Sequence, residues 1–189
     1  MDLFSDRIRI LMRRALPIRF VLPAALAVFA AGSVLLFSQT IETAEMILKK
    51  EFPGTAIERK TLYLTREEGE ILSRCCGESS RVHTFYLASD QGGVRGFGIF
   101  DTHVVRTKEE TLFIVVDAAG IVKHVQVAAF LEPRDYLAPD RWFALFKGKT
   151  AGSSFDQPPI TGATLTVKAA KNAVRRALEL HRLHARSLQ

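Results

Sequence analysis

One long apolar stretch, followed by a series of shorter alternating segments, forms the hydropathy pattern of this chain. Phe20 to Ile41 contains no charged residue. As a helix, these residues would span about 33 Å at about 1.5 Å per residue, which matches the hydrocarbon core of a bilayer. Pro23 lies in the first turns, where a helix tolerates proline. We therefore expect a transmembrane helix over residues 20–41.

The charges on either side of this segment indicate its orientation. The arginines that precede it are Arg7, Arg9, Arg13, Arg14 and Arg19, and Glu42 and Glu45 follow it. The positive-inside rule then places residues 1–19 in the cytoplasm and the C-terminal domain on the extracytoplasmic, periplasmic side of a bacterial inner membrane. A cleaved signal peptide is the alternative, with Val28-Phe29-Ala30 as a weak cleavage signal. The apolar run continues to Phe37, which favours an uncleaved single-pass anchor.

The remainder of the chain has the pattern of a stalk and one α+β domain. Residues 42–54 predict a helical stalk that ends at Pro53-Gly54, and residues 55–189 predict the domain. Apolar alternation and turn residues predict strands over 57–64, 82–88, 94–105, 111–116 and 121–130. Helices are expected over 65–74, 139–146 and 167–183, the first with Thr65 as its N-cap. An antiparallel hairpin at 111–130 favours α+β over a doubly wound sheet.

The last predicted helix has two distinct faces. Its apolar stripe consists of Val167, Ala170, Val174, Ala177, Leu178 and His181. A basic stripe beside it consists of Lys168, Lys171, Arg175, Arg182 and Arg186. We expect the first stripe to face the core.

The positive charge of the chain is concentrated at its two ends. The net charge is +6, of which residues 1–41 carry +3 and residues 167–189 carry +5, so the middle is slightly acidic. A basic chain can bind nucleic acid. Here the membrane topology explains the first cluster, and we expect no nucleic-acid binding.

The two cysteines, Cys75 and Cys76, are adjacent. Neighbouring Cα atoms lie about 3.8 Å apart, below the usual span of about 4.4–6.8 Å for a disulfide, which disfavours a mutual bridge. We expect two ordinary thiols or an intermolecular pair. The alternative is a vicinal redox or thiol-capture site in an oxidising compartment. The chain has no Cys-x-x-Cys spacing for haem, zinc or an iron–sulfur cluster.

The segment Ile160-Thr161-Gly162-Ala163-Thr164-Leu165-Thr166 follows two prolines and precedes the last predicted helix. Small residues between hydroxyl residues give a tightly turning backbone that displays Thr164. The start of a helix presents free N–H groups and the positive end of the dipole, which favour a phosphate. A plain turn with Thr164 or Thr166 as N-cap is the alternative.

Thr161-Gly162-Ala163-Thr164 resembles the attachment motif of the covalent FMN-binding domain family. That family includes the FMN-carrying subunits of the Rnf complex and of the sodium-pumping NADH:quinone reductase. The resemblance implies that Thr164 is esterified to the FMN phosphate by a flavin transferase. The transferase favours an Asp three residues before the motif, where this chain has Pro158. A noncovalent FMN site is therefore the alternative.

Other parts of residues 55–183 match the family in order. They are the glycine-containing strand around Gly96-Phe97-Gly98, the hairpin turn at 117–120, Phe130-Leu131-Glu132-Pro133, Trp142 and Phe146-Lys147-Gly148. The Phe130–Pro133 segment is similar to a Glu-Thr-Pro-Gly segment that borders the flavin in relatives.

The resemblance gives an expected division of labour within the site. Thr161, Gly162 and Ala163 allow close approach of the phosphate, with Thr166 in the same helix start. The candidates for the isoalloxazine slot are Leu112, Phe130, Glu132, Tyr136, Trp142 and Leu165. Core packing is the alternative for Tyr136 and Trp142.

The sequence thus indicates a membrane-anchored FMN electron carrier that works with redox partners in or at the membrane. The rival is a tethered binding or scaffold module without a cofactor. We expect no metal site: Asp101 and His103 share a strand face but are too few ligands, and we expect a surface pair. His181 and His184 are expected to be an ordinary helix-face pair.

Overall fold

The structure is a computed structural model that describes residues 44–77 and 80–184. The predicted membrane segment and the basic N-terminus lie outside these residues. Within them, no helix is both long enough and apolar enough to cross a bilayer.

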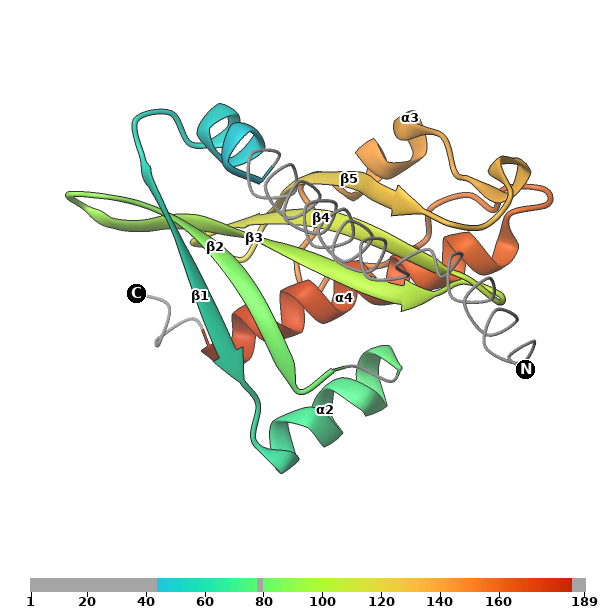
Figure 1. The fold of residues 1–189 in the computed structure, drawn as a ribbon, viewed down its shortest axis with the longest axis horizontal. Helices are drawn as coiled ribbons and strands as arrows, with labels where there is room; N and C mark the ends of the chain where they lie inside the picture. Colours follow the sequence, from blue (N-terminus) through green and yellow to red (C-terminus); the bar gives the residue numbers. More distant parts are fainter. Residues whose placement is uncertain (1–43, 78–79, 185–189) are drawn as a thin grey trace, which may run out of the picture. The chain divides into compact units, whose positions relative to one another are not determined.

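Five antiparallel strands form one sheet in the order β1-β2-β3-β4-β5 (Figure 1). Their bounds are β1 (Ala56–Tyr63), β2 (Val82–Asp90), β3 (Gly93–Val104), β4 (Glu109–Asp117) and β5 (Val122–Phe130). Each strand pairs with the next one along the chain. The predicted strands and the α+β class are confirmed.

Helices lie before, between and after these strands. They are residues 44–51, α2 (Arg66–Cys76), α3 (Asp140–Phe143) and α4 (Thr164–His184), with short 3₁₀ turns η2 (Arg134–Tyr136) and η3 (Ala144–Phe146). The predicted cap of α2 is confirmed as a capping box: Glu68 N donates to Thr65 Oγ1 at 3.2 Å, and Thr65 N donates to Glu68 Oε2 at 2.8 Å. Residues 44–51 are helical, as predicted for that part of the chain, and Ala44 and Leu48 in this helix are fully buried.

The last helix, α4, begins three residues earlier than predicted. Val167 N donates to Ala163 O at 2.9 Å, so Thr164 to Thr166 form the first turn rather than a loop. The prediction placed the start at the first core-facing residue, Val167. The polar first turn has no apolar periodicity of its own and was therefore assigned to the loop.

Helix α4 packs across one face of the sheet, with α2 beside it (Figure 1). The predicted apolar stripe is buried from Val167 to Leu178, and Ala173 and Leu180 extend it. The strands contribute Phe85, Leu87, Phe97, Ile99, Leu112, Ile114 and Val116 to the same core. Alanines on α4 bring its backbone close to these large side chains, which permits dense packing.

The opposite face of β3 explains the two glycines of that strand. Successive side chains of a strand point to opposite faces, so Gly96 and Gly98 face away from Phe97 and the α4 core. A Cβ atom at Gly96 would collide with the ring of Phe52 and would lie 2.6 Å from the carbonyl oxygen of Val116. At Gly98 it would collide with the ring of Phe113. Both glycines are therefore closely approached by neighbouring groups.

We expect Gly96→Ala to destabilise the protein by about 1–3 kcal/mol, because the backbone carbonyl of Val116 cannot yield as a side chain can. Gly152→Ala is the matched control, since a Cβ there meets no atom within 4 Å. That variant should change the free energy of unfolding by less than about 1 kcal/mol. Urea denaturation followed by circular dichroism measures both, and equal stability of the two variants would contradict the packing at β3.

Candidate functional site

A small pocket lies at the start of α4. It has a volume of about 210 Å³ and is lined by Arg106, Tyr136, Gly162, Ala163, Thr164, Leu165 and Thr166. The structure thus brings Tyr136 together with five of the predicted motif residues. Arg106 is an addition that the sequence did not predict.

The turn before α4 leaves the first helical amides facing outward. Ala163 N donates to Ile160 O at 3.0 Å, and Gly162 has a φ of 82°, a left-handed conformation that suits glycine. The N–H groups of Thr164 and its two successors have no acceptor within the helix. Ala163, which precedes them, has no side-chain oxygen to cap them. Thr164 is exposed beside these amides.

Thr166 takes a different role from the one expected. It is buried, and its Oγ1 donates to Tyr136 O at 2.7 Å. The hydroxyl is therefore engaged with the 3₁₀ turn η2 rather than with the helix amides. This contact holds η2 against the first turn of α4, which places Tyr136 at the pocket.

Glu132 holds the turn that carries Arg106. Its Oε1 accepts hydrogen bonds from the backbone N–H groups of Arg106, Thr107 and Lys108 at 3.3, 2.7 and 2.8 Å. These bonds, chiefly those from Thr107 and Lys108, lower the pKa of the carboxyl group. Glu132 thereby fixes the turn between β3 and β4 and is not among the residues that line the pocket.

Arg106 extends from that turn to the pocket. Its guanidinium carbon lies 4.7 Å from the centre of the Tyr136 ring, a cation–π contact. A guanidinium and an open helix start at one pocket both favour an anion. The residue was missed because Arg106-Thr107-Lys108 has the composition of an ordinary surface turn.

The remaining predicted residues lie elsewhere. Trp142 is buried in the core, where its Nε1 donates to Pro158 O at 2.9 Å, and Leu112 is fully buried beneath α4. Phe130 is partly buried at the end of β5, and Thr161 is exposed in the turn. The structure therefore assigns Trp142 and Leu112 to packing. Trp142 belongs to the hydrophobic core, whereas Tyr136 is partly buried at the pocket.

A second polar cluster lies under the middle of α4. Arg176 makes two hydrogen bonds to Asp101, Nε to Oδ2 at 2.6 Å and Nη2 to Oδ1 at 2.7 Å. His103 lies between two carboxylates, with Nδ1 2.9 Å from Asp101 Oδ1 and Nε2 3.1 Å from Glu110 Oε2. Asp101 is 5% exposed and Glu110 is fully buried. The expectation of a surface pair at Asp101 and His103 is therefore wrong, because the partner that buries them, Arg176, is distant in sequence.

The cluster favours the charged forms of Asp101 and His103. Burial opposes ionisation of Asp101, but the hydrogen bonds and charges of Arg176 and His103 outweigh it and lower the pKa of Asp101 to about 2. Burial likewise opposes a charge on His103, but Asp101 and Glu110 raise its pKa to about 9. At neutral pH Asp101 is therefore ionised and His103 is protonated.

The expectation of two unlinked thiols is also wrong. Cys75 and Cys76 form a disulfide with each other, with Cα atoms 3.8 Å apart. His181 stacks on Phe97 and has its Nε2 3.2 Å from Ala118 O, so it packs and bonds within the fold.

No group of three or more His, Cys, Asp or Glu side chains in the described parts of the chain is arranged to hold a metal ion. Neither a family model nor a curated protein matches this chain.

The His103 pKa generates a prediction about stability against pH. A pKa raised from 6.5 to about 9 on folding stabilises the protein fully below pH 6.5, and this stabilisation is lost as the pH rises through 9. It amounts to about 3 kcal/mol, because each pKa unit corresponds to about 1.4 kcal/mol. Unfolding free energies of the wild type and of His103→Gln, measured from pH 6 to pH 10, should show this decline only in the wild type. Parallel pH profiles of the unfolding free energy in the two proteins would contradict the raised pKa of His103.

Proposed function

We propose that this chain is a membrane-anchored flavoprotein of the extracytoplasmic side that carries FMN at the start of α4 and transfers electrons between redox partners. The observation that supports it most is that Gly162, Ala163 and Thr164 of the motif, an open helix start and Arg106 meet at one pocket. The membrane anchor at 20–41 and the periplasmic location are part of the proposal and rest on the sequence.

The residues present fit the phosphate end of FMN. A phosphate there would meet the N–H groups of the first helical turn, the positive end of a 21-residue helix and the Arg106 guanidinium. Gly162 carries no side chain, and a Cβ at that position would meet nothing within 4 Å, so the approach is open. The exposed Thr164 hydroxyl stands at the same place, where it would form the ester.

The pocket accommodates the isoalloxazine ring of FMN less completely than the phosphate. A volume of about 210 Å³ is below the roughly 300–1,000 Å³ typical of small-molecule pockets, so it suits the phosphate end rather than a whole enclosed FMN. Leu165 is 47% exposed, and Tyr136 is partly buried, so these two side chains offer apolar surface to the isoalloxazine. A ring held on such a surface would remain accessible to a partner protein.

The flavin would supply the redox chemistry, accepting and donating electrons. The protein would hold and orient it: Thr164 as the point of attachment, Arg106 as the phosphate partner, and Glu132 as the residue that positions Arg106 by accepting from its backbone N–H. A flavin transferase would be needed for maturation. Electron donors and acceptors would be redox proteins in or at the membrane.

Thr164→Ala tests the attachment. We expect wild-type protein, expressed with a flavin transferase in an exporting bacterial host, to fluoresce under ultraviolet light in a denaturing gel. Its mass should exceed that of the chain by FMN less water, localised to the peptide containing Thr164. Thr164→Ala should abolish both signals because it removes the esterified oxygen. Thr164→Ser should retain both signals because it keeps the hydroxyl oxygen.

The outcomes separate the alternatives. Covalent flavin retained in Thr164→Ala would refute the residue assignment. An unmodified wild-type mass with native yellow colour would establish a noncovalent site. The chain could also be unmodified and colourless when a control flavoprotein produced beside it is correctly modified. That result would refute the flavin proposal and favour the cofactor-free scaffold module.

Arg106→Ala tests the phosphate partner independently of the ester. We expect it to weaken binding of free FMN to unmodified chain by about tenfold or more, because a hydrogen bond to a charged group contributes about 1.5–3 kcal/mol. Arg95→Ala is the charge-matched control, since Arg95 forms its ion pair with Asp90 and lines no part of this pocket. Fluorescence titration with FMN measures both, and equal affinities would remove Arg106 from the site.

A further inference from the structure

The disulfide between Cys75 and Cys76 closes a ring at the C-terminal end of α2. The ring contains the peptide bond that joins the two residues, so opening it changes the freedom of that peptide. The two residues differ in exposure: Cys75 is exposed, whereas Cys76 is 2% exposed. A thiolate from outside can therefore approach at Cys75.

This disulfide contributes little as a structural crosslink. A disulfide stabilises a fold mainly by restricting the unfolded chain, and the effect grows with the length of the loop that it closes. Here the sequence separation is one residue, so almost no loop is closed. Stabilisation of the fold therefore does not explain why these two cysteines are bonded.

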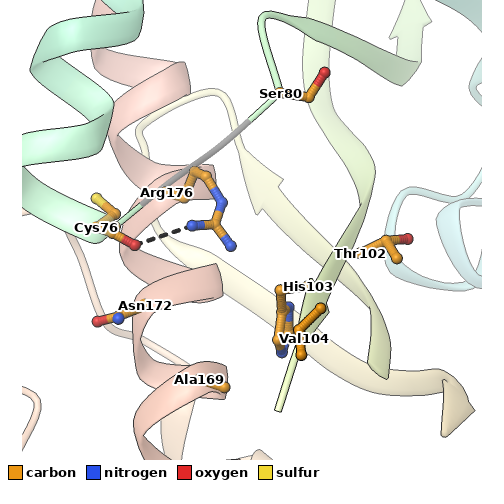
Figure 2. Close-up of a pocket in the computed structure, with 9 residues that line it drawn as sticks. Cys76, Ser80, Thr102, His103, Val104, Ala169, Asn172 and Arg176 are labelled. Carbon is orange, nitrogen blue, oxygen red and sulfur yellow. Dashed lines mark hydrogen bonds between the residues drawn. The ribbon is translucent and has the colours of Figure 1, made fainter. Parts of the chain in front are cut away.

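The surroundings of Cys76 allow the ring to open within the folded protein. Cys76 and Gly77 line a pocket of about 520 Å³, together with Ser80, Thr102, His103, Val104, Ala169, Asn172 and Arg176 (Figure 2). The backbone of Cys76 and Gly77 therefore borders open space on one side.

Arg176 fixes the carbonyl group attached to this ring. Its Nη1 donates to Cys76 O at 3.0 Å, and its other contacts are the two bonds to Asp101. In Figure 2 the carbonyl of Cys76 points toward Arg176 and its sulfur points the other way. The guanidinium thus holds the backbone of the bonded form through the carbonyl group, on the side away from the Cys76 sulfur (Figure 2).

We propose that Cys75–Cys76 is a thiol–disulfide exchange site that accepts two electrons from an external dithiol, with Arg176 as a positioning residue that stabilises the oxidised form. A thiolate of the dithiol attacks Cys75 Sγ, the Sγ–Sγ bond breaks, and Cys76 leaves as a thiolate that takes up a proton. The second thiol of the dithiol loses its proton and attacks the mixed disulfide, and Cys75 leaves as a thiolate and is protonated. The dithiol is oxidised to a disulfide, and Cys75 and Cys76 are reduced to two thiols.

The exchange is tested on the purified full chain in detergent, without denaturant, with dithiothreitol as the dithiol. Samples are equilibrated at different ratios of reduced to oxidised dithiothreitol and quenched with a maleimide. The mass of the intact chain is then measured by mass spectrometry. We expect either two or no maleimides per chain, with a midpoint that is the same from both directions. A peptide map without a Cys75–Cys76 link, or reduction that occurs only in urea, would overturn the proposal.

Two single-cysteine variants test the point of attack. Cys76→Ser leaves the exposed Cys75 thiol, and Cys75→Ser leaves the buried Cys76 thiol. We expect the first to react with an aromatic disulfide reagent at least about tenfold faster, because exposure governs access to a thiol. Equal rates would refute attack at Cys75.

Arg176→Met tests the positioning role, with Arg182→Met as the control, since Arg182 pairs with Glu179 on the surface of the same helix. We expect the first to lower the ratio of reduced to oxidised dithiothreitol at the midpoint by about tenfold, because it removes a charged hydrogen bond to Cys76 O. The control should leave the midpoint unchanged. An unshifted midpoint in folded Arg176→Met would refute this role. If that variant does not fold, Arg176→Lys replaces it, while the wild-type titration decides the exchange site by itself.

Discussion

Neutralisation of one buried guanidinium is the constraint on which the arrangement of this domain depends. Arg176 is 4% exposed, and an unpaired charge at that depth would cost many kcal/mol. Its partners come from two other elements: Asp101 from β3 and the carbonyl of Cys76 from the end of α2. The hydrogen bonds to Asp101 and to Cys76 O can form at the same time in only one arrangement of these elements. Arg176 therefore fixes where α2 and α4 lie against the sheet. A buried pair of this kind specifies geometry more than it adds stability.

The same helix connects this cluster to the pocket at its start. From Thr164 to Arg176, α4 advances by about 18 Å at about 1.5 Å per residue. Its first turn is held by Thr166 against the carbonyl of Tyr136, and its middle by Arg176 against Asp101. The open amides of the first turn are therefore positioned by a helix that is anchored at two points. A rigid support of this kind is what an anion site requires, because its donors need to be fixed before the ligand arrives.

The two proposals place electron transfer at two separate sites along α4, its first turn and the region of Arg176, and they rest on different chemistry. The FMN proposal rests on Arg106, Thr164 and the helix start, whereas the exchange proposal rests on a bond between two cysteines and the carbonyl that Arg176 holds. Neither depends on the other. If both hold, the domain combines a flavin with a dithiol–disulfide pair, and each would exchange electrons with its own external partner.

Local sequence was sufficient for the secondary structure. Alternation of apolar residues predicted all five strands, and Thr65 with Glu68 three residues later predicted the start of α2, because these signals act within one turn or one strand. The pocket was predictable in part for the same reason: Thr161 to Thr166 are contiguous, and a bare turn before a helix exposes its amides. The beginning of α4 was predicted too late because its polar first turn has no apolar periodicity.

Tertiary structure decided which of the polar residues are buried and what they contact. Arg175 and Arg176 are neighbours of the same type, yet Arg175 is exposed and Arg176 is buried, and nothing local distinguishes them except the helix face. The partner of Arg176 lies 75 residues away, and Arg106 reaches Tyr136 from a turn 30 residues earlier. Contacts over such separations are set by strand register and by how helices pack on the sheet. The sequence by itself determined the elements and the exposed motif, whereas only the packed sheet and helices determined the ion cluster, the arginine at the pocket and the surroundings of the disulfide.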